Sequence, residues 1–215
     1  MVKGVILDFD GVLVRSMELH AEAYRRVLAR YDLTFPDRTI FLLEGATSEE
    51  IIEHLLQEHG VKHDKALVDK LADEKQRTYQ RLGPPQLYDG ADKMVRDIRA
   101  AVPKLGLVTG TRRDNLDTYI PNLMPLFDRT LTAGEYSRGK PHPEPYEKTA
   151  AAMGVRPGHC AAIENAPRGV QSAAAAGFDL VVAITTTVSK DDLRAADHVV
   201  STHGEAAAAV LEWLG

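Results

Sequence analysis

Two aspartates, Asp8 and Asp10, stand at the end of the first apolar run of the chain, where their spacing suits joint chemistry. The run at 5–7 has the length and branched side chains of a buried parallel strand. A carboxylate directly after such a strand lies at its carboxyl end, where open α/β sheets bind ligands, and residues two apart on extended backbone point the same way. Two carboxylates about 4 Å apart repel by roughly 4 kcal/mol at an effective dielectric of about 20. The pair therefore needs a cation, a shared proton or divided roles, unless it is only an acidic Asp-Gly turn that closes the strand.

Two further apolar runs end in polar residues, and a lysine is fixed between them. Thr109 and Gly110 close one run, where a hydroxyl and free backbone N–H groups at a helix start bind anions; a plain N-cap is the alternative for Thr109. Lys140 lies between a glycine and a series of prolines that stiffen the backbone and present its ammonium to phosphate. Glu164 and Asn165 offer hard oxygen ligands for Mg²⁺, with an Asx turn as the alternative for Asn165. These groups suit phosphoryl transfer, in which a metal and a cation neutralise phosphate charge while a carboxylate attacks phosphorus.

Such chemistry needs strands that end at one edge of a sheet, and the rest of the chain supplies them. Short apolar runs alternate with helical patterns, which predicts an α/β fold: a Rossmann-like parallel sheet covered by helices on both faces. Strands are expected at 5–7, 105–109, 128–132, 160–164, 180–184 and 198–200, and helices after Asp89, after Pro145 and around the alanine-rich tail 206–209.

The interval after the first strand contains helical patterns and no convincing strand. Helices are expected at about 16–31, after the capping box Thr47–Glu50, and at about 64–82. We therefore predict a small helical cap domain at 15–85, inserted into a catalytic α/β core formed by 1–14 and 86–215. A lid over a strand-end pocket would exclude water, although a block packed permanently against the sheet also fits the sequence.

The composition is that of an ordinary globular protein, with 215 residues, 44% hydrophobic and 27% charged. A net charge of -5 without a dense basic stripe argues against a nucleic-acid partner. The single cysteine, Cys160, excludes an internal disulfide, fits a reducing compartment and is interpreted as a buried small hydrophobe. There is no signal-peptide pattern and no apolar stretch of membrane-spanning length, about 20 residues. We expect a cytoplasmic protein with no membrane partner; no long apolar heptad demands a second chain, so we expect a monomer and leave an oligomer open.

The order of these motifs resembles the haloacid dehalogenase-like phosphatase superfamily, in the β-phosphoglucomutase-like branch with a helical cap after the first strand. The resemblance covers nearly the whole chain through four spaced motifs. They are Asp8-Phe-Asp10-Gly-Val-Leu13, Thr109, Lys140-Pro-His-Pro, and Glu164-Asn165-Ala-Pro-Arg-Gly169 continuing to Ala176-Gly177.

The resemblance implies that Asp8 is a nucleophile that forms an aspartyl-phosphate. Asp10 would protonate the leaving alcohol and then act as the base for the attacking water. Metal-bound Asp8 would stay ionised, while Asp10 would hold a proton beside a like charge. Thr109, Gly110 and Lys140 would bind the phosphate.

The implied Mg²⁺ would lie between the Asp8 carboxylate, the Asp10 backbone carbonyl and the pair Glu164 and Asn165. Relatives usually carry Glu-Asp in the fourth motif, so Asn165 should weaken Mg²⁺ binding or shift coordination onto Glu164. A second departure is Arg15, where relatives commonly carry an acid. His20 matches a histidine of sugar-phosphate relatives near the hinge and is a candidate substrate-binding residue, with packing as the alternative.

The leading prediction is a Mg²⁺-dependent phosphatase for a small phosphorylated metabolite, of the sugar phosphate or phosphoglycolate type. A phosphosugar mutase is an alternative, but holding the far phosphate should need a basic cap residue, and the cap stretch 44–50 has none. A dehalogenase has no need of an acid at Asp10. A phospho-accepting receiver module would usually place its acceptor on a middle strand with no cap after it. The cap supplies most selectivity in this fold, so the sequence does not identify the substrate.

Overall fold

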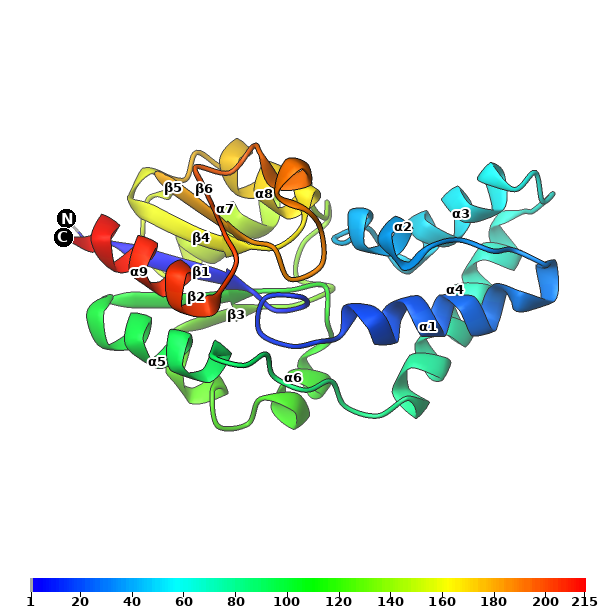
Figure 1. Ribbon diagram of the computed structural model, residues 1–215, viewed down its shortest axis with the longest axis horizontal. Helices are drawn as coiled ribbons and strands as arrows, with labels where there is room; N and C mark the ends of the chain where they lie inside the picture. The colour runs from blue at the N-terminus through cyan, green and yellow to red at the C-terminus, as the bar shows by residue number, and fades with distance from the viewer. Residues whose placement is uncertain (1) are drawn as a thin grey trace.

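In the computed structural model, which describes residues 2–215 apart from the side chain of residue 114, the chain folds around a six-stranded parallel sheet. The strand order is β3-β2-β1-β4-β5-β6, which places β1 between β2 and β4 (Figure 1). The strands are β1 (Gly4–Asp8), β2 (Lys104–Val108), β3 (Arg129–Leu131), β4 (Cys160–Glu164), β5 (Leu180–Ile184) and β6 (His198–Val200). The predicted strands and the predicted α/β fold class are confirmed, with each strand end within one residue of its expected place.

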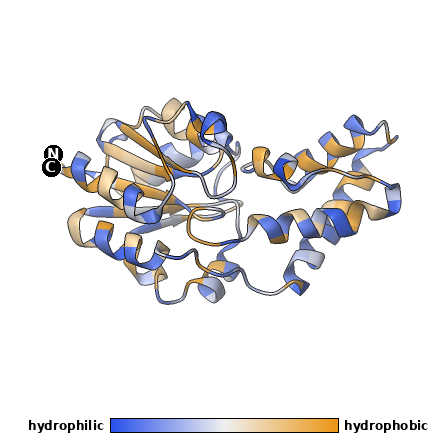
Figure 2. Cartoon of the chain, in the orientation of Figure 1, coloured by the Kyte–Doolittle hydropathy of each residue, from blue (hydrophilic) through white to orange (hydrophobic). Residues whose placement is uncertain are grey.

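Helices cover the sheet on both faces, because alternate side chains of each buried strand point to opposite sides. On one face Leu7 and Val182 pack with residues of α5 (Ala91–Ala101) and α9 (His203–Leu214). On the other face Ile6 packs with residues of α7 (Glu144–Ala152) and α8 (Pro167–Ala175). Figure 2 shows the result, with largely apolar strands and helices of mixed character. No helix among the described residues is long and apolar enough to cross a membrane.

Four helices between β1 and α5 share a hydrophobic cluster of their own, and Phe41 and Leu42 of α2 also pack against the core. The four helices are α1 (Met17–Leu28), α2 (Asp37–Leu42), α3 (Ser48–Glu58) and α4 (Lys65–Arg81), and Figure 1 shows them extending to one side of the sheet. Tyr24, Leu55 and Leu71 lie in their shared hydrophobic cluster, which contains no residue of the strands. The predicted capping box opens α3, with Thr47 Oγ1 accepting from the Glu50 backbone and Glu50 Oε2 from the Thr47 backbone. This packing supports the division into core and cap at 15–85, which stays a proposal.

The chain passes between the sheet and these helices twice, and the two crossings are hydrogen-bonded to each other. Val14 and Leu87 form an antiparallel bridge. The Arg15 amide donates to the Gln86 carbonyl at 2.8 Å, and the Tyr88 amide donates to the Leu13 carbonyl at 2.9 Å. The crossings therefore form a short two-stranded ribbon at the two expected boundaries between core and cap.

Candidate active site

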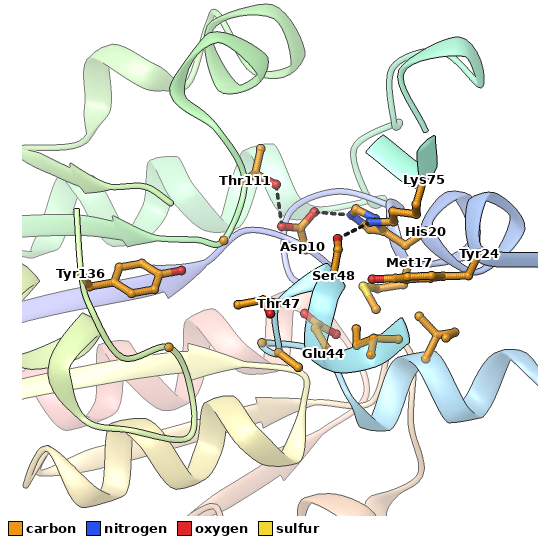
Figure 3. A pocket seen from close by; sticks show the side chains of 16 residues that line it. Asp10, Met17, His20, Tyr24, Glu44, Thr47, Ser48, Lys75, Thr111 and Tyr136 are labelled. Atoms are coloured by element: carbon orange, nitrogen blue, oxygen red, sulfur yellow. Dashed lines mark hydrogen bonds and ion pairs between the residues drawn. The ribbon is translucent and has the colours of Figure 1, made fainter. Parts of the chain in front are cut away.

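A cavity of about 170 Å³ lies between the sheet and the cap. Figure 3 shows Thr111 and Tyr136 approaching from the core, with Glu44 and Lys75 approaching from the cap. Of the predicted site residues, Asp10, Gly110 and His20 line this cavity. Asp8, Thr109, Lys140, Glu164 and Asn165 surround it as a buried polar layer at the strand ends, described below.

Lys140 joins the ends of β1 and β4. Its Nζ donates to Asp8 Oδ1 at 2.7 Å and to Glu164 Oε1 at 2.6 Å, and Tyr146 OH donates to the same Glu164 oxygen at 2.6 Å. Burial opposes the charge on Lys140, but Asp8 and Glu164 outweigh it and hold the lysine pKa well above its usual value. Burial is also the main reason that the pKa of Asp8 is raised, and the Lys140 charge opposes that shift. The lysine thus binds both carboxylates and offsets part of their negative charge before any ligand is bound.

Two glycines allow the fourth-motif side chains to fit. A methyl group at Gly169, in the first turn of α8, would overlap the Glu164 carboxylate. That carboxylate therefore lies against a helix N-terminus, where backbone N–H groups favour negative charge. A methyl group at Gly11, whose φ is +74°, would overlap the side-chain amide of Asn165.

Three hydroxyl groups converge on Asp10. Ser16 donates to Oδ1 at 2.7 Å, while Thr109 and Thr111 donate to Oδ2 at 3.1 and 2.9 Å. Burial opposes the charge on Asp10, but the hydrogen bonds from His20, Ser16 and Thr111 outweigh it and lower its pKa to about 2.

Without a metal ion, the pKa of Asp8 is raised and that of Asp10 is lowered. The expected division, a metal-bound Asp8 that stays ionised beside a protonated Asp10, stays a prediction. The sequence did not identify the hydroxyl donors from Ser16 and Thr111 to Asp10. Thr109 is not the N-cap of the following helix. Arg112 takes that place, at the start of α6 (Arg113–Tyr119), and the Thr109 hydroxyl bonds to Asp10 instead.

His20 connects Asp10 to a lysine of the cap. Its Nε2 lies 3.7 Å from Asp10 Oδ1, and its Nδ1 lies 2.9 Å from Lys75 Nζ. The ring stacks on Tyr79, with centroids 4.1 Å apart. An ammonium can only donate, so Nδ1 is the acceptor and Nε2 carries the proton that faces Asp10. Burial lowers the pKa of Lys75 to about 8, and burial followed by the Lys75 charge lowers the pKa of His20.

Sequence reasoning missed two charged residues of the cavity, although both carried a signal. Lys75 lies on the buried face of α4, in register with Leu71 and Tyr79, and a charge within an apolar stripe is unusual. Glu44 directly follows an apolar run, which is the same pattern that indicated Asp8 and Glu164. Arg15, the other departure from the family pattern, lies outside the cavity lining and 3.6 Å from Asp89.

Glu44 reaches across from the cap to Asn165. Asn165 Nδ2 donates to Glu44 Oε2 at 2.7 Å and to Thr187 Oγ1 at 3.1 Å. Glu44 Oε1 and Asn165 Oδ1 are both buried without a hydrogen-bond partner among the described residues. Burial, followed by the charges of Asp8 and Glu164, raises the pKa of Glu44.

The donor set at these strand ends fits a hard divalent cation. It consists of carboxylate and amide oxygens, and Asn165 Oδ1 is a buried acceptor that lacks a donor. No three His, Cys, Asp or Glu side chains of the described residues are grouped as a ready metal cage. Lys140 binds oxygens of both Asp8 and Glu164 in this arrangement. The predicted ligands Asp8, Asp10, Glu164 and Asn165 therefore stay a prediction.

Comparisons with known proteins agree with this geometry. The family model for haloacid dehalogenase-like hydrolases matches residues 2–177. The chain is 29% identical over 200 residues to validoxylamine A 7'-phosphate phosphatase of Streptomyces hygroscopicus subsp. limoneus, covering 92% of each. It is 29% identical over 185 residues to the β-phosphoglucomutase of Bacillus subtilis (strain 168), covering 82% of this chain and 81% of that protein.

Among solved structures, a putative β-phosphoglucomutase from Bacteroides vulgatus superposes with a TM-score of 0.84. It is 25% identical, and the match covers 99% of this chain and 90% of that one. The family model matches most of the chain, and the fold agrees with it. The protein therefore belongs to the haloacid dehalogenase-like hydrolases, which confirms the family and the enzyme class, a phosphoric monoester hydrolase, that its motifs predict.

Proposed function

We propose that the protein is a Mg²⁺-dependent phosphatase that hydrolyses a small phosphate monoester through an aspartyl-phosphate at Asp8. The observation that carries the proposal is the division between two buried carboxylates two residues apart. Asp8 is bonded to the Lys140 ammonium, whereas Asp10 is bonded to three hydroxyl groups and faces the cavity. One carboxylate is held for attack beside a cation, and the other is free to exchange protons with a ligand.

The residues present would divide the work as follows. Lys140 fixes the orientation of the Asp8 carboxylate and offsets phosphate charge as it approaches. Ionised Asp10 can accept the proton of an attacking water. A phosphate dianion beside Asp10 would raise the aspartate pKa by like-charge repulsion, which favours the protonated form needed to release an alcohol. Bound Mg²⁺, held by Asp8, the Asp10 carbonyl, Glu164 and Asn165, would neutralise the transferring phosphoryl group.

The cavity supports a small polar substrate of the sugar phosphate or phosphoglycolate type. Its volume of about 170 Å³ is close to the ~150 Å³ of an engineered cavity that holds one benzene ring. Its lining includes the side chains of Ser48, Thr111 and Lys75, which suit hydroxyl groups. The validoxylamine phosphatase among the relatives supports the same class.

A panel of small phosphate esters, assayed for phosphate release with and without Mg²⁺, tests the proposal. Asp8→Asn should reduce turnover by at least about 1,000-fold, because an amide cannot act as the nucleophile. The exposed Asp73→Asn of α4 is the matched control and should retain wild-type turnover. Mass spectrometry after rapid quenching should place a phosphoryl group on the peptide that contains Asp8. Wild-type turnover by a folded Asp8→Asn variant contradicts the assignment.

Lys75 supports one second candidate, a phosphosugar mutase. The stretch 44–50 has no basic residue, as the sequence shows, but the cap supplies a buried ammonium to the cavity from α4 instead. The argument against a mutase therefore loses its basis, and a β-phosphoglucomutase is among the relatives. Interconversion of hexose phosphates without net phosphate release would establish this second candidate, and phosphate release that exceeds interconversion would rule it out.

A further inference from the structure

We propose that Glu44 of the cap replaces the carboxylate that the core lacks at position 165, so that the divalent cation is bound by core and cap together. The inference rests on the proposed function, because it assumes a cation beside Asp8. It adds a ligand from the cap, and it makes cation binding and docking of the cap one event.

The first support is that two side chains hydrogen-bonded across the interface each have one unsatisfied acceptor. Asn165 is fully buried and Glu44 is 8% exposed, and one hydrogen bond of 2.7 Å joins them. The remaining oxygen of each, Asn165 Oδ1 and Glu44 Oε1, is buried without a hydrogen-bond partner among the described residues. A buried acceptor without a donor costs about 1–3 kcal/mol. A divalent cation satisfies two such acceptors at once; a bridging water would do so too, but its hydrogen bonds would not depend on Mg²⁺.

The second support is that the other carboxylates are already engaged. Lys140 binds Asp8 Oδ1 and Glu164 Oε1, and the Asn165 amide binds Glu164 Oε2. Both oxygens of Asp10 accept hydroxyl hydrogen bonds. Of the carboxylates at the site, within the described chain, only Glu44 has a buried oxygen without a hydrogen-bond partner.

The third support is the backbone that delivers Glu44. Gly45 has φ +90°, a conformation that glycine adopts without strain, and a Cβ there would lie 2.9 Å from Lys140 Cβ. A Cβ at Gly139 would lie 3.4 Å from the Gly45 carbonyl. The cap loop therefore packs closely against the segment that carries Lys140. This packing holds the Glu44 carboxylate at the strand ends.

The buried charged groups around the site also favour a bound cation. Asp8, Asp10, Glu44 and Glu164 face two buried ammonium groups, those of Lys75 and Lys140. Buried charge is stable only when it is paired. A divalent cation would pair with these carboxylates in their ionised form, whereas a neutral Glu44 that only holds a proton would leave cation binding independent of the cap.

Titration calorimetry with Mg²⁺ alone distinguishes a Glu44 that binds the cation from a neutral Glu44 that only holds a proton. Glu44→Gln keeps the shape of the side chain and should bind Mg²⁺ at least tenfold more weakly than the wild type. The exposed Glu53→Gln of α3 is the matched control and should bind as the wild type does. In the double variant Glu44→Gln/Asn165→Asp the carboxylate returns to the core, so the affinity should recover to within a few-fold of wild type.

Equal Mg²⁺ affinity of folded Glu44→Gln and wild type would overturn this inference and leave the proposed function in place. A wild type that binds no Mg²⁺ would overturn both. Hydrogen exchange of the unmutated protein gives a second readout that needs no variant. Saturating Mg²⁺ should slow amide exchange at 43–47 several-fold and leave the distal cap loop 59–64 unchanged; unchanged exchange at 43–47 contradicts the inference.

Discussion

Single residues set the chemistry of this site through contacts that tolerate little change. Lys140 binds two carboxylates that would otherwise repel, and hydrogen bonds from His20, Ser16 and Thr111 lower the pKa of Asp10. Gly169 has an equally specific role, since its missing side chain leaves the space for the Glu164 carboxylate. The geometry of the site therefore depends on the missing side chain at Gly169 as much as on the side chains that are present.

Gly169→Ala should therefore destabilise the protein. A methyl group would overlap the Glu164 carboxylate, and overpacking of this kind costs about 1–3 kcal/mol. Displacement of Glu164 should also loosen Lys140 and lower phosphatase turnover. Urea unfolding and phosphate release measure the two effects. Gly158→Ala, where a Cβ meets nothing within 4 Å, is the control and should leave both unchanged; equal unfolding midpoints for the two variants would contradict the steric argument.

Among the secondary-structure elements, α4 places a buried charge against the cavity. Lys75 lies on the apolar face of that helix, with its ammonium 4.6 Å from the centre of the Tyr24 ring. The desolvation of this ammonium lowers its pKa to about 8. The element therefore places a charge at the cavity at a cost in stability, and this cost is relieved when the lysine loses its proton.

The pH dependence of unfolding tests whether the buried Lys75 ammonium destabilises the folded state. Between about pH 8 and the usual lysine value of 10.5, the unfolded chain binds more protons at Lys75 than the folded chain, so this group makes the folded state more stable as pH rises. Lys75→Met removes this pH-dependent contribution to the free energy of unfolding. The advantage of Lys75→Met over wild type in free energy of unfolding should therefore shrink by about 3 kcal/mol from pH 7 to pH 10.5. Urea unfolding at several pH values measures it, and a difference that stays constant with pH would contradict the lowered pKa.

The elements also show how far sequence reasoning reaches. Most of the strands were predictable because they are short apolar runs, although β3 has a single apolar residue. The long cap helices were predictable because their apolar residues recur at helical spacing. The short helix α2 was missed, since six residues give too few turns to show a period, whereas the helix start expected after Thr109 and Gly110 is that of α6. The cap was expected as a block, but its approach to the core through Glu44 depends on tertiary packing, which no local pattern reports.

At the scale of the whole molecule, the cap and the sheet have different hydrophobic clusters, so we expect them to open with different free energies. The clusters on the two faces of the sheet share strands, whereas the cap cluster is built from its own helices and the loops between them. Local unfolding tends to involve one such cluster at a time, because each cluster has its own buried area. The cap should therefore open at a lower free energy than the sheet.

Leu55→Ala probes this difference. Leu55 is fully buried in the cap cluster, and such a truncation costs about 2–5 kcal/mol. Native-state hydrogen exchange should show protection lost in α3 and α4 while β1 and β4 keep theirs. Val182→Ala in β5 is the matched core change and should lower protection in β1 and β4 while α3 and α4 keep theirs, because the cap opens without the sheet. An equal loss in β1 and α3 after Leu55→Ala would mean that cap and core open as one.

The paired crossings at Val14 and Leu87 have a consequence for how the cap can be observed. Two strands of chain that are hydrogen-bonded to each other cannot twist independently, so any swing of the cap has close to one degree of freedom. The position of every cap atom is then a function of a single angle. One pair of spectroscopic labels, placed on α3 and on the sheet, would follow the complete trajectory.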